Sequence, residues 1–259
     1  MQDLKIKLEN NKIFFLIISF TIFSFYVFAN EITDPSKTEI WEPSPKIVSI
    51  SNKYIPSDAI ILFDGNSLAN WNSIEGGDAP WLVENNFFTI KPGSGNIVTK
   101  RKFTDVQLHI EWRTPLEVTK KCKIMPCTGQ GEGNSGVFLQ KRYEVQILDS
   151  FENKTYVNGQ AGSIYKQFIP LVNVSKEPGT WQTYDIIFRA PTFDDNKNLK
   201  KNALMTVLHN GVLIQNNSIL RGSTAFIGYP KYEFHEGDSI MLQDHGNEVS
   251  FRNIWVREL

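Results

Sequence analysis

From Ile60 to the C-terminus the chain is a succession of short β-type segments separated by turn residues, with almost no apolar periodicity of 3.6 residues. Closely spaced segments of this kind are typical of antiparallel sandwiches and jelly rolls. The dipeptide Asn210-Gly211 favours a tight hairpin, because both residues tolerate the positive φ angles of a type I′ turn. We therefore expect an all-β protein, an antiparallel β-sandwich or jelly roll. The clearest strand patterns cover residues 81–90, 106–112, 135–139, 143–148, 183–188, 203–208, 212–215, 239–243 and 249–256.

The first 29 residues have the pattern of a secretory signal peptide. Lysines precede an apolar run from Ile13 to Phe28, and Ala29 supplies a small residue before a cleavage site at Asn30. The alternative is an uncleaved anchor, although this run of about 16 residues is just short of the ~17 needed to span a bilayer. Either way we expect an exported protein, periplasmic or at the cell surface.

Residues 30–57 are rich in proline and polar residues, which predicts an extended tether before one globular domain over residues 58–259. That domain is long enough to enclose a proper core. The formal net charge of the chain is −1 and no basic block stands out, so nucleic acid is not an expected partner. The 18 Phe, 8 Tyr and 6 Trp suit a β core and also suit stacking on sugar rings.

The segment 143–149 carries polar groups that suit sugar chemistry. In an extended strand its apolar residues face one side, so Glu144 and Gln146 face the other side together. Asp149 rejoins the face of Glu144 only if a bulge inserts one extra residue. Its alternative role is to cap the turn that follows the strand.

Two further strands place polar side chains together. Along residues 106–113 every second residue is polar, so one face carries Gln107, His109, Glu111 and Arg113. Along residues 240–245, Gln243 and His245 share a face at the end of the strand. These faces could meet a ligand, and a solvated outer face is the alternative explanation of the same patterns.

Cys122 and Cys127 are the only cysteines of the chain. In an oxidising compartment we expect them to form a small-loop disulfide, with two free thiols as the alternative. No cluster of possible metal ligands has a recognised spacing, so we predict no cofactor. A structural Ca²⁺ held by loop oxygens would have no such signature and stays open.

Eight motifs follow one another along the chain: 62–71, 133–139, 143–150, 159–165, 178–187, 208–212, 242–246 and 251–256, among them Leu-Phe-Asp-Gly, Tyr-Glu-Val-Gln-Ile-Leu-Asp and Leu-Gln-Asp-His-Gly. Together they resemble the 3-keto-disaccharide hydrolase domain, a widespread bacterial family with a concanavalin A-like jelly-roll fold. The resemblance extends from about residue 58 to the C-terminus, nearly all of the chain beyond the signal and tether.

The resemblance implies hydrolysis of glycosides whose sugar ring is oxidised at C3. A ketone at C3 acidifies the hydrogen on C2, so a base can remove it, the C1 substituent can leave by elimination, and water can then add. Such a reaction needs a base, a stabiliser for the enolate oxygen and an acid for the leaving group, but no redox cofactor. The oxidation itself would belong to a separate sugar 3-dehydrogenase, a functional partner of this protein.

The candidate residues have the following roles. Glu144 is the first candidate for the general base, or for the nucleophile if hydrolysis takes the ordinary glycosidase route, and Gln146 could bind a sugar hydroxyl. His245 is the candidate general acid because imidazole titrates near neutrality, and Arg113 could stabilise developing negative charge. Each has a structural alternative, such as an ion pair or a turn contact. Further candidate substrate contacts are Asp149, Glu111, His109, Tyr165, Gln243 and Trp181, the last with core packing as its alternative.

Two other functions stay open. The same sheet face could belong to a non-catalytic carbohydrate-binding module, or to a conventional glycosidase or glucanase of the same fold. Glucanases of this fold use a Glu-x-Asp-x-Glu strand, whereas this chain has Glu-x-Gln-x-x-Asp from Glu144 to Asp149. That departure puts the standard mechanism with two carboxylates in doubt.

Overall fold

The computed structural model describes residues 33–51, 54–116 and 128–259. The predicted signal peptide and the predicted disulfide between Cys122 and Cys127 fall outside these residues. Within them, no helix is both long enough and apolar enough to cross a membrane.

The chain divides into two units, Met1–Ile47 and Val48–Leu259. In the first unit the described residues contain one short 3-10 helix, η1 (Pro35–Thr38), which begins where Asp34 accepts a hydrogen bond from the amide of Ser36. The predicted tether and its boundary with the domain stay a prediction.

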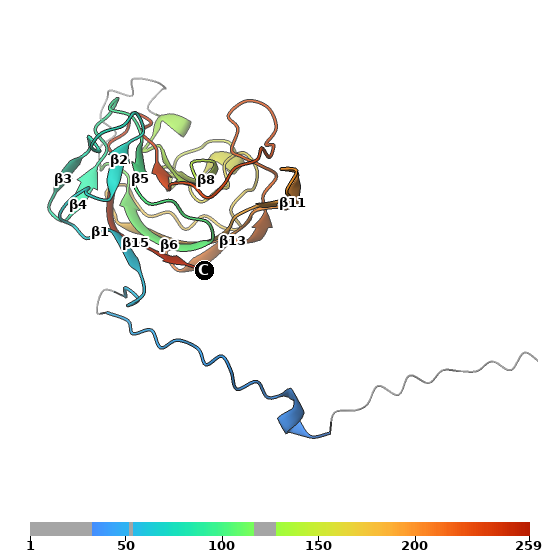
Figure 1. The fold of residues 1–259 in the computed structure, drawn as a ribbon. Coiled ribbons are helices and arrows are strands. Elements are labelled where there is room, and N and C mark those ends of the chain that lie inside the picture. Colours follow the sequence, from blue (N-terminus) through green and yellow to red (C-terminus); the bar gives the residue numbers. More distant parts are fainter. Residues whose placement is uncertain (1–32, 52–53, 117–127) are drawn as a thin grey trace, which may run out of the picture. The chain divides into compact units, whose positions relative to one another are not determined.

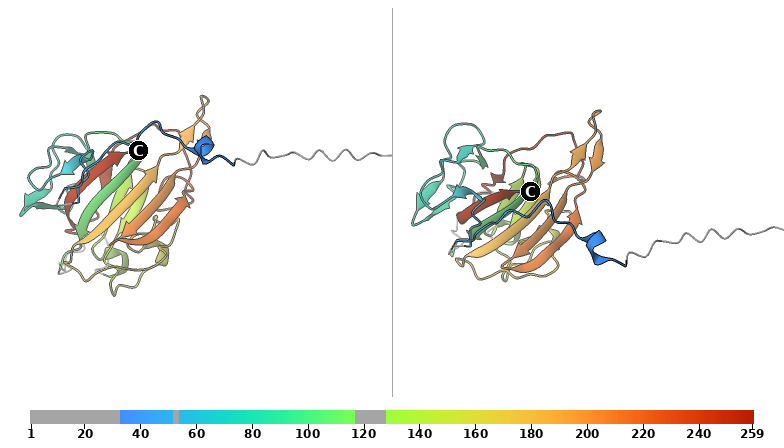
Figure 2. Two further views of the ribbon diagram at one scale, coloured as in Figure 1. Left: turned by 90° about the horizontal axis from the view of Figure 1, so that it is seen from below. Right: turned by 60° about the horizontal axis from the view of Figure 1, so that its bottom comes forward.

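The second unit is an antiparallel β-sandwich, as the sequence predicted, and Figure 1 shows its two main sheets as layers. The larger sheet has eight strands in the order β13-β12-β9-β6-β15-β4-β3, with β1 also paired to β15. Figure 2 shows its long strands side by side. Their bounds are β1 (Ile60–Phe63), β3 (Leu82–Glu84), β4 (Phe87–Thr89), β6 (Val106–Arg113), β9 (Gln182–Arg189), β12 (Leu204–His209), β13 (Val212–Ile219) and β15 (Ser250–Glu258).

The smaller sheet has five strands in the order β2-β5-β14-β7-β8. A separate hairpin joins β10 to β11, and two more 3-10 turns lie in the connections. The bounds are β2 (Trp71–Ser73), β5 (Ile97–Thr99), β7 (Ser135–Leu139), β8 (Tyr143–Ile147), β10 (Thr192–Phe193), β11 (Leu199–Lys201), β14 (Met241–Leu242), η2 (Gly129–Gly131) and η3 (Val157–Gly159).

The core lies between the two sheets and follows from the alternation of apolar residues. Every second residue of β6 is buried, and Trp112 at its end packs against Tyr184 of β9 with ring centroids 5.1 Å apart. From the smaller sheet, Val145 and Ile147 enter the same core. The buried hydroxyl of Tyr184 donates a hydrogen bond of 2.8 Å to the carbonyl of Gln146, which ties the two layers together.

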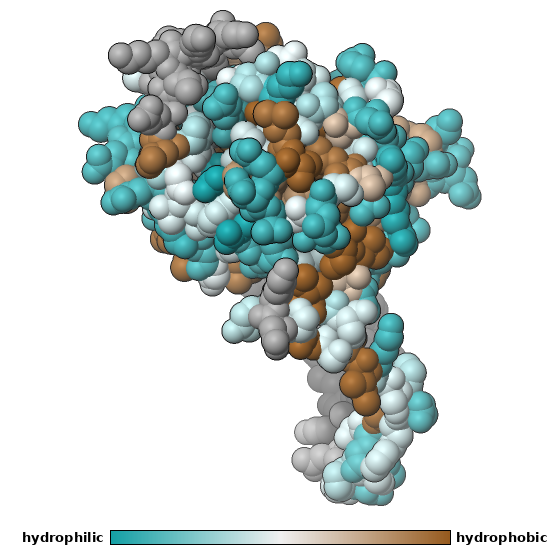
Figure 3. Space-filling model, turned by 90° about the vertical axis from the view of Figure 1, so that its left-hand side faces the viewer, coloured by the Kyte–Doolittle hydropathy of each residue, from teal (hydrophilic) through white to brown (hydrophobic). Residues whose placement is uncertain are grey.

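Turn residues explain why one predicted hairpin is confirmed and why one predicted strand is instead a hairpin. The predicted hairpin at Asn210 and Gly211 is confirmed, with φ of 52° and 78°, between β12 and β13. The segment 81–90, predicted as one strand, is instead the hairpin of β3 and β4. Asn85 and Asn86 turn the chain with φ of 48° and 65°, conformations that Asn tolerates better than other non-glycine residues. On the side of the domain that carries this hairpin, apolar residues form a band between hydrophilic ones (Figure 3).

Candidate active site

A pocket of about 270 Å³ lies on the outer face of the five-stranded sheet. Val137 and Val145 face the core, so the alternate residues of β7 and β8 face outward and form the pocket floor. The segment before β7 and the connections after β8, β13 and β14 supply its walls. The lining residues are Gln130, Asn134, Phe138, Glu144, Gln146, Tyr156, Tyr165, Thr224, Phe226, Gln243 and His245.

Glu144 is the buried carboxyl group of this pocket, with 3% of its surface exposed. It shares the floor with Gly136, where an added Cβ would lie 2.7 Å from the Glu144 Oε1 atom, so glycine makes room for the carboxyl group. Its backbone is fixed by bonds to the hydroxyl of Thr224 and the amide of Tyr165, at 3.1 and 3.2 Å. Burial raises the pKa of Glu144 to about 8, because the charged carboxylate loses hydration.

Side-chain amides line one wall and orient each other. Gln146 Nε2 donates to Asn134 Oδ1 at 3.1 Å, and Asn134 Nδ2 donates to the carbonyl of Gln130 at 2.6 Å. Gln130 Nε2 in turn donates to the carbonyl of Gly159 at 2.8 Å. These bonds fix the rotamer of each amide. Since all three side chains line the pocket, they present a pre-ordered polar wall to a ligand.

Aromatic rings form the other wall. Tyr156 and Tyr165 are joined by a hydrogen bond of 2.6 Å between their hydroxyl groups. The ammonium group of Lys166 lies 5.7 and 5.6 Å from the centroids of these two rings, and 4.3 Å from the ring of Phe226. A pocket with both amide and aromatic walls is suited to a sugar ring, which has polar edges and apolar faces.

Gln243 and His245 enter the pocket from the segment that follows β14. The amide of Gln243 donates to the carbonyl of Gly136 at 3.1 Å, and Ser135 Oγ donates to the carbonyl of Gln243 at 2.8 Å. These bonds attach the segment to β7. Burial lowers the pKa of His245, so its imidazole is neutral at pH 7.

The structure brings together these predicted site residues: Glu144, Gln146, Tyr165, Gln243 and His245. Arg113, Glu111 and His109 lie elsewhere, on the outer face of the eight-stranded sheet, because the alternate residues of β6 fill the core. The two groups therefore occupy opposite faces of the sandwich. The sequence predicted that Arg113, Glu111 and His109 belong to the same site as Glu144. The structure corrects this expectation, because none of the three lines the pocket.

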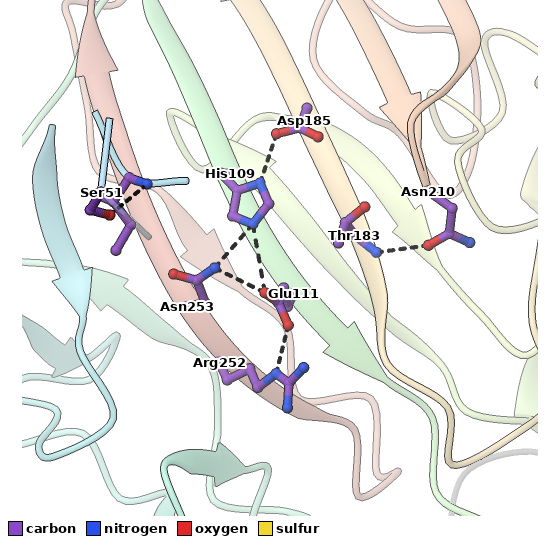
Figure 4. A network of polar contacts seen from close by, with 9 residues as sticks. Ser51, His109, Glu111, Thr183, Asp185, Asn210, Arg252 and Asn253 are labelled. Carbon is purple, nitrogen blue, oxygen red and sulfur yellow. Dashed lines mark hydrogen bonds and ion pairs between the residues drawn. The ribbon is translucent and has the colours of Figure 1, made fainter. Parts of the chain in front are cut away.

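The outer-face residues form a network of ion pairs and hydrogen bonds (Figure 4). His109 Nδ1 lies 2.7 Å from Asp185 Oδ1, Arg252 Nε donates to Glu111 Oε2 at 2.6 Å, and Asn253 Nδ2 donates to Glu111 Oε1 at 2.9 Å. Burial disfavours the imidazolium, but bonds and charge attraction from Asp185 and Glu111 outweigh it and raise the pKa of His109 to about 9.

Glu111 is held in its ionised form by the same network. Burial opposes its ionisation, but hydrogen bonds from His109, Asn253 and Arg252 lower its pKa to about 2. A hollow of about 540 Å³ adjoins Glu111, Arg252 and Asn253. Because these charges are already paired with each other, the network has the character of a structural support for β6 and β15.

Arg113 and Trp181 belong to a cation–π stack on this face. The guanidinium of Arg113 lies 4.5 Å from the ring of Phe87 and 4.6 Å from the ring of Trp181. Arg252 lies 4.2 Å from the same Trp181 ring. Trp181 is thus outside both the central core and the pocket, and its ring contacts two guanidinium groups.

Asp149 lies near the pocket without lining it. The pairing of β7 with β8 runs without a register shift from Tyr143 to Ile147, where β8 ends, and Asp149 follows beyond the strand. Its Oδ1 atom accepts a hydrogen bond of 3.2 Å from the amide of Phe151, an Asx turn. This geometry is the turn-capping role that the sequence left open.

Comparisons with known proteins agree with this architecture. Residues 58–257 match the model of the 3-keto-alpha-glucoside-1,2-lyase-like domain. The chain belongs to this family.

Solved structures extend the relationship. A candidate glycosyl hydrolase from Parabacteroides distasonis ATCC 8503, determined at 2.13 Å, is 46% identical, with a TM-score of 0.82 over 87% of this chain and 97% of that one. Two further candidate glycosyl hydrolases from that organism are 22% and 19% identical, with TM-scores of 0.55 and 0.52. Each match covers 78% of this chain, and the matches cover 94% of the first structure and 99% of the second. They show that the fold is shared. No functionally curated protein sequence matched the chain.

Membership of the 3-keto-alpha-glucoside-1,2-lyase-like family identifies the chain as a glycoside hydrolase-type enzyme. Several lining residues escaped the sequence analysis: Gln130, Asn134, Phe138, Tyr156, Thr224 and Phe226. Alternation with Val137 could have placed Phe138 on the face of Glu144. Tyr156 and Phe226 are in irregular connections, where no periodic pattern reveals which way a side chain points.

Proposed function

We propose that this protein cleaves glycosidic bonds of 3-keto-glycosides by base-assisted elimination followed by hydration. The observation that carries the proposal is the composition of the pocket. Among the lining residues, which all lie in the described part of the chain, Glu144 is the single carboxyl group. Ordinary glycosidases need two carboxyl groups facing the scissile bond. A pocket with one favours a route in which a base alone starts the reaction.

Glu144 suits the role of that base. The C2 hydrogen of a 3-keto sugar is only weakly acidic, so a base with a raised pKa accepts its proton more readily than an ordinary carboxylate does. With a pKa of about 8, Glu144 is partly ionised near neutral pH, and the fraction that is the reactive carboxylate grows as pH rises toward 8. Glu144 could instead act as a nucleophile only with a second carboxyl group as its acid–base partner. No other carboxyl group is among the described residues that line the pocket.

The neighbouring groups would hold the sugar. Gln146 and Asn134 present amides that can bond to ring hydroxyl groups, and neutral His245 can donate or accept a hydrogen bond. The pocket volume of about 270 Å³ suits one sugar ring more than a long glycan chain. The 1,2-lyase in the family description is consistent with loss of the C1 substituent and the C2 hydrogen.

The reaction fits a place after an oxidation step. Elimination and hydration cause no net redox change, so a separate dehydrogenase must supply the 3-keto group. We further propose that the protein is exported, because of the signal-like residues 1–29, and that it meets its substrate in the periplasm or at the cell surface.

The test is turnover of a 3-keto-α-glucoside by the purified protein, with the released 3-keto sugar measured by chromatography. We expect the native protein to release sugar and Glu144→Gln to lose at least ~100-fold in kcat. The matched control is Glu132→Gln, a carboxyl group whose pKa is also raised by burial but which does not line the pocket. It should stay within about twofold of the native rate.

Three outcomes would contradict the proposal. Failure of the native protein to release sugar, together with tight glycan binding by calorimetry, would indicate a carbohydrate-binding module. Faster cleavage of the unoxidised glucoside would indicate a conventional glycosidase. An unchanged rate in Glu144→Gln would remove Glu144 from the chemistry.

A further inference from the structure

The hydroxyl groups of Tyr156 and Tyr165 form an isolated pair inside the pocket. Their oxygen atoms lie 2.6 Å apart, and both rings line the same cavity as Glu144. Two hydroxyl groups hold two protons, and the bond between them uses one. Within the described residues neither hydroxyl group has another hydrogen-bond partner, so the second proton can bond to a ligand in the pocket.

We propose that Tyr156 is a catalytic residue that protonates the departing glycosidic oxygen, and that Tyr165 is a positioning residue that holds and activates it. This inference rests on the proposed function, because it assigns the acid to a reaction in which Glu144 is the base. The sequence had assigned the acid to His245.

The difference in burial between the two tyrosines indicates which hydroxyl proton is available to a ligand. Tyr165 is 8% exposed, whereas Tyr156 is 40% exposed and stands nearer to an entering ligand. Burial raises the pKa of both phenols, far more for Tyr165. Among the described residues the buried Tyr165 hydroxyl has only Tyr156 as a hydrogen-bond partner, so we assign Tyr165 as the donor of the shared bond and Tyr156 as its acceptor. This leaves the proton of the more exposed Tyr156 for a ligand. The donated bond also stabilises a phenolate on Tyr156.

The fold holds the ring of Tyr156 in place. A Cβ atom at Gly159 would overlap this ring, so the glycine lets the ring lie against the backbone of η3. The amide of Lys166 donates to the carbonyl of Asn158 at 2.8 Å, which joins this turn to the segment that carries Tyr165. The two tyrosines are thus positioned by backbone contacts as well as by their own bond.

Other possible donors are less suitable. His245 is neutral at pH 7 because burial lowers its pKa, so it lacks the acidic imidazolium proton. Lys166 uses its ammonium group to donate to the carbonyl of Phe226 at 2.6 Å. Its Nζ atom also lies 5.7 Å from the centroid of the Tyr156 ring, a cation–π contact. Arg113 is on the other face of the sandwich.

The proton and electron changes balance as follows. The Glu144 carboxylate takes the C2 proton, the electron pair of that C–H bond forms the C1=C2 bond, and the C1–O bond breaks. The Tyr156 proton passes to the leaving oxygen, which departs as an alcohol. The Tyr156 phenolate then takes a proton from the water that adds to C1, and Glu144 returns a proton to C2. The net change is the addition of one water molecule.

The test compares two 3-keto-glucosides that differ in leaving group, 4-nitrophenol and an alkyl alcohol. The alkyl alcohol needs a proton to depart, and 4-nitrophenol does not. We expect Tyr156→Phe to lose ~100-fold or more in kcat on the alkyl substrate and less than about tenfold on the nitrophenyl substrate. Tyr165→Phe should show the same pattern with a smaller loss. The double variant should lose little more than Tyr156→Phe alone.

The control is Tyr229→Phe, which removes the hydroxyl of a tyrosine that is 95% exposed and outside the pocket lining. It should match the native protein on both substrates. If Tyr156→Phe loses activity equally on both substrates, or on neither, the inference is overturned. The proposed function would still stand in that case, because the native protein turns over both substrates. Absence of turnover by the native protein on either substrate would remove both proposals together.

Discussion

At the scale of single residues, the burial of Glu144 raises its pKa and also has a cost in stability. Its pKa is about 8 in the folded protein and near 4.5 in the unfolded chain. Between these values the unfolded state releases the proton while the folded state keeps it, so stability falls as pH rises from about 4.5 to about 8. Above that range the penalty is constant, and below it the penalty is absent.

Glu144→Gln should remove this pH-dependent penalty. We expect the variant to be more stable than the native protein by a few kcal/mol at pH 8, since a pKa change costs roughly 1.4 kcal/mol per unit. At pH 4 the two proteins should differ little. Urea unfolding at both pH values measures the difference, with Glu132→Gln as the matched variant. A stability difference that is the same at pH 4 and pH 8 would show that Glu144 titrates normally.

At the scale of the strand, β6 shows what a sequence can predict and what it cannot. Alternation identified the polar face of β6 and the polar face of β8, and the structure confirms both. It could not say that these faces belong to different sheets, because that depends on strand order. Asn85 and Asn86 were missed for a related reason, since a turn without glycine is hard to distinguish from strand continuation. The pocket residues in irregular connections had no periodic signal at all.

The placement of β6 makes a prediction about Glu111. Its removal would leave Arg252, Asn253 and protonated His109 without their shared acceptor. Glu111→Gln should therefore lower the free energy of unfolding at pH 7 by about 1–3 kcal/mol, and kcat/KM should stay within about twofold of the native value. Denaturant unfolding and initial rates measure these effects. A large loss of activity in a stable variant would place the outer face in the reaction.

The support from this network should also depend on pH in a defined direction. His109 has a raised pKa of about 9, so its contribution is full below its ordinary value of 6.5 and is lost as pH rises through 9. Glu111 has a lowered pKa of about 2, so its contribution is full above about 4.5 and is lost as pH falls through 2. The network is thus strongest between about pH 4.5 and 6.5.

At the scale of the whole molecule, the sandwich separates support from chemistry. One outer face carries paired charges that stabilise the large sheet, and the other carries the pocket with Glu144, the amide wall and the paired tyrosines. The core between them contains the apolar residues of both sheets. The fold and family follow from the sequence motifs, whereas the identity of the acid depends on which loops meet over the small sheet.

Deuterium incorporation tests the central claim most directly. The native protein is incubated with a 3-keto-glucoside in D₂O, and the released sugar is examined early in the reaction by NMR and mass spectrometry. Glu144→Gln with added 3-keto sugar measures background exchange. Elimination and hydration predict that the released sugar carries deuterium at C2 from its first appearance, above that background. Released sugar that keeps its C2 hydrogen, together with no slowing of turnover when that hydrogen of the substrate is replaced by deuterium, would contradict the account, because the glycosidic bond would then have broken without removal of that proton.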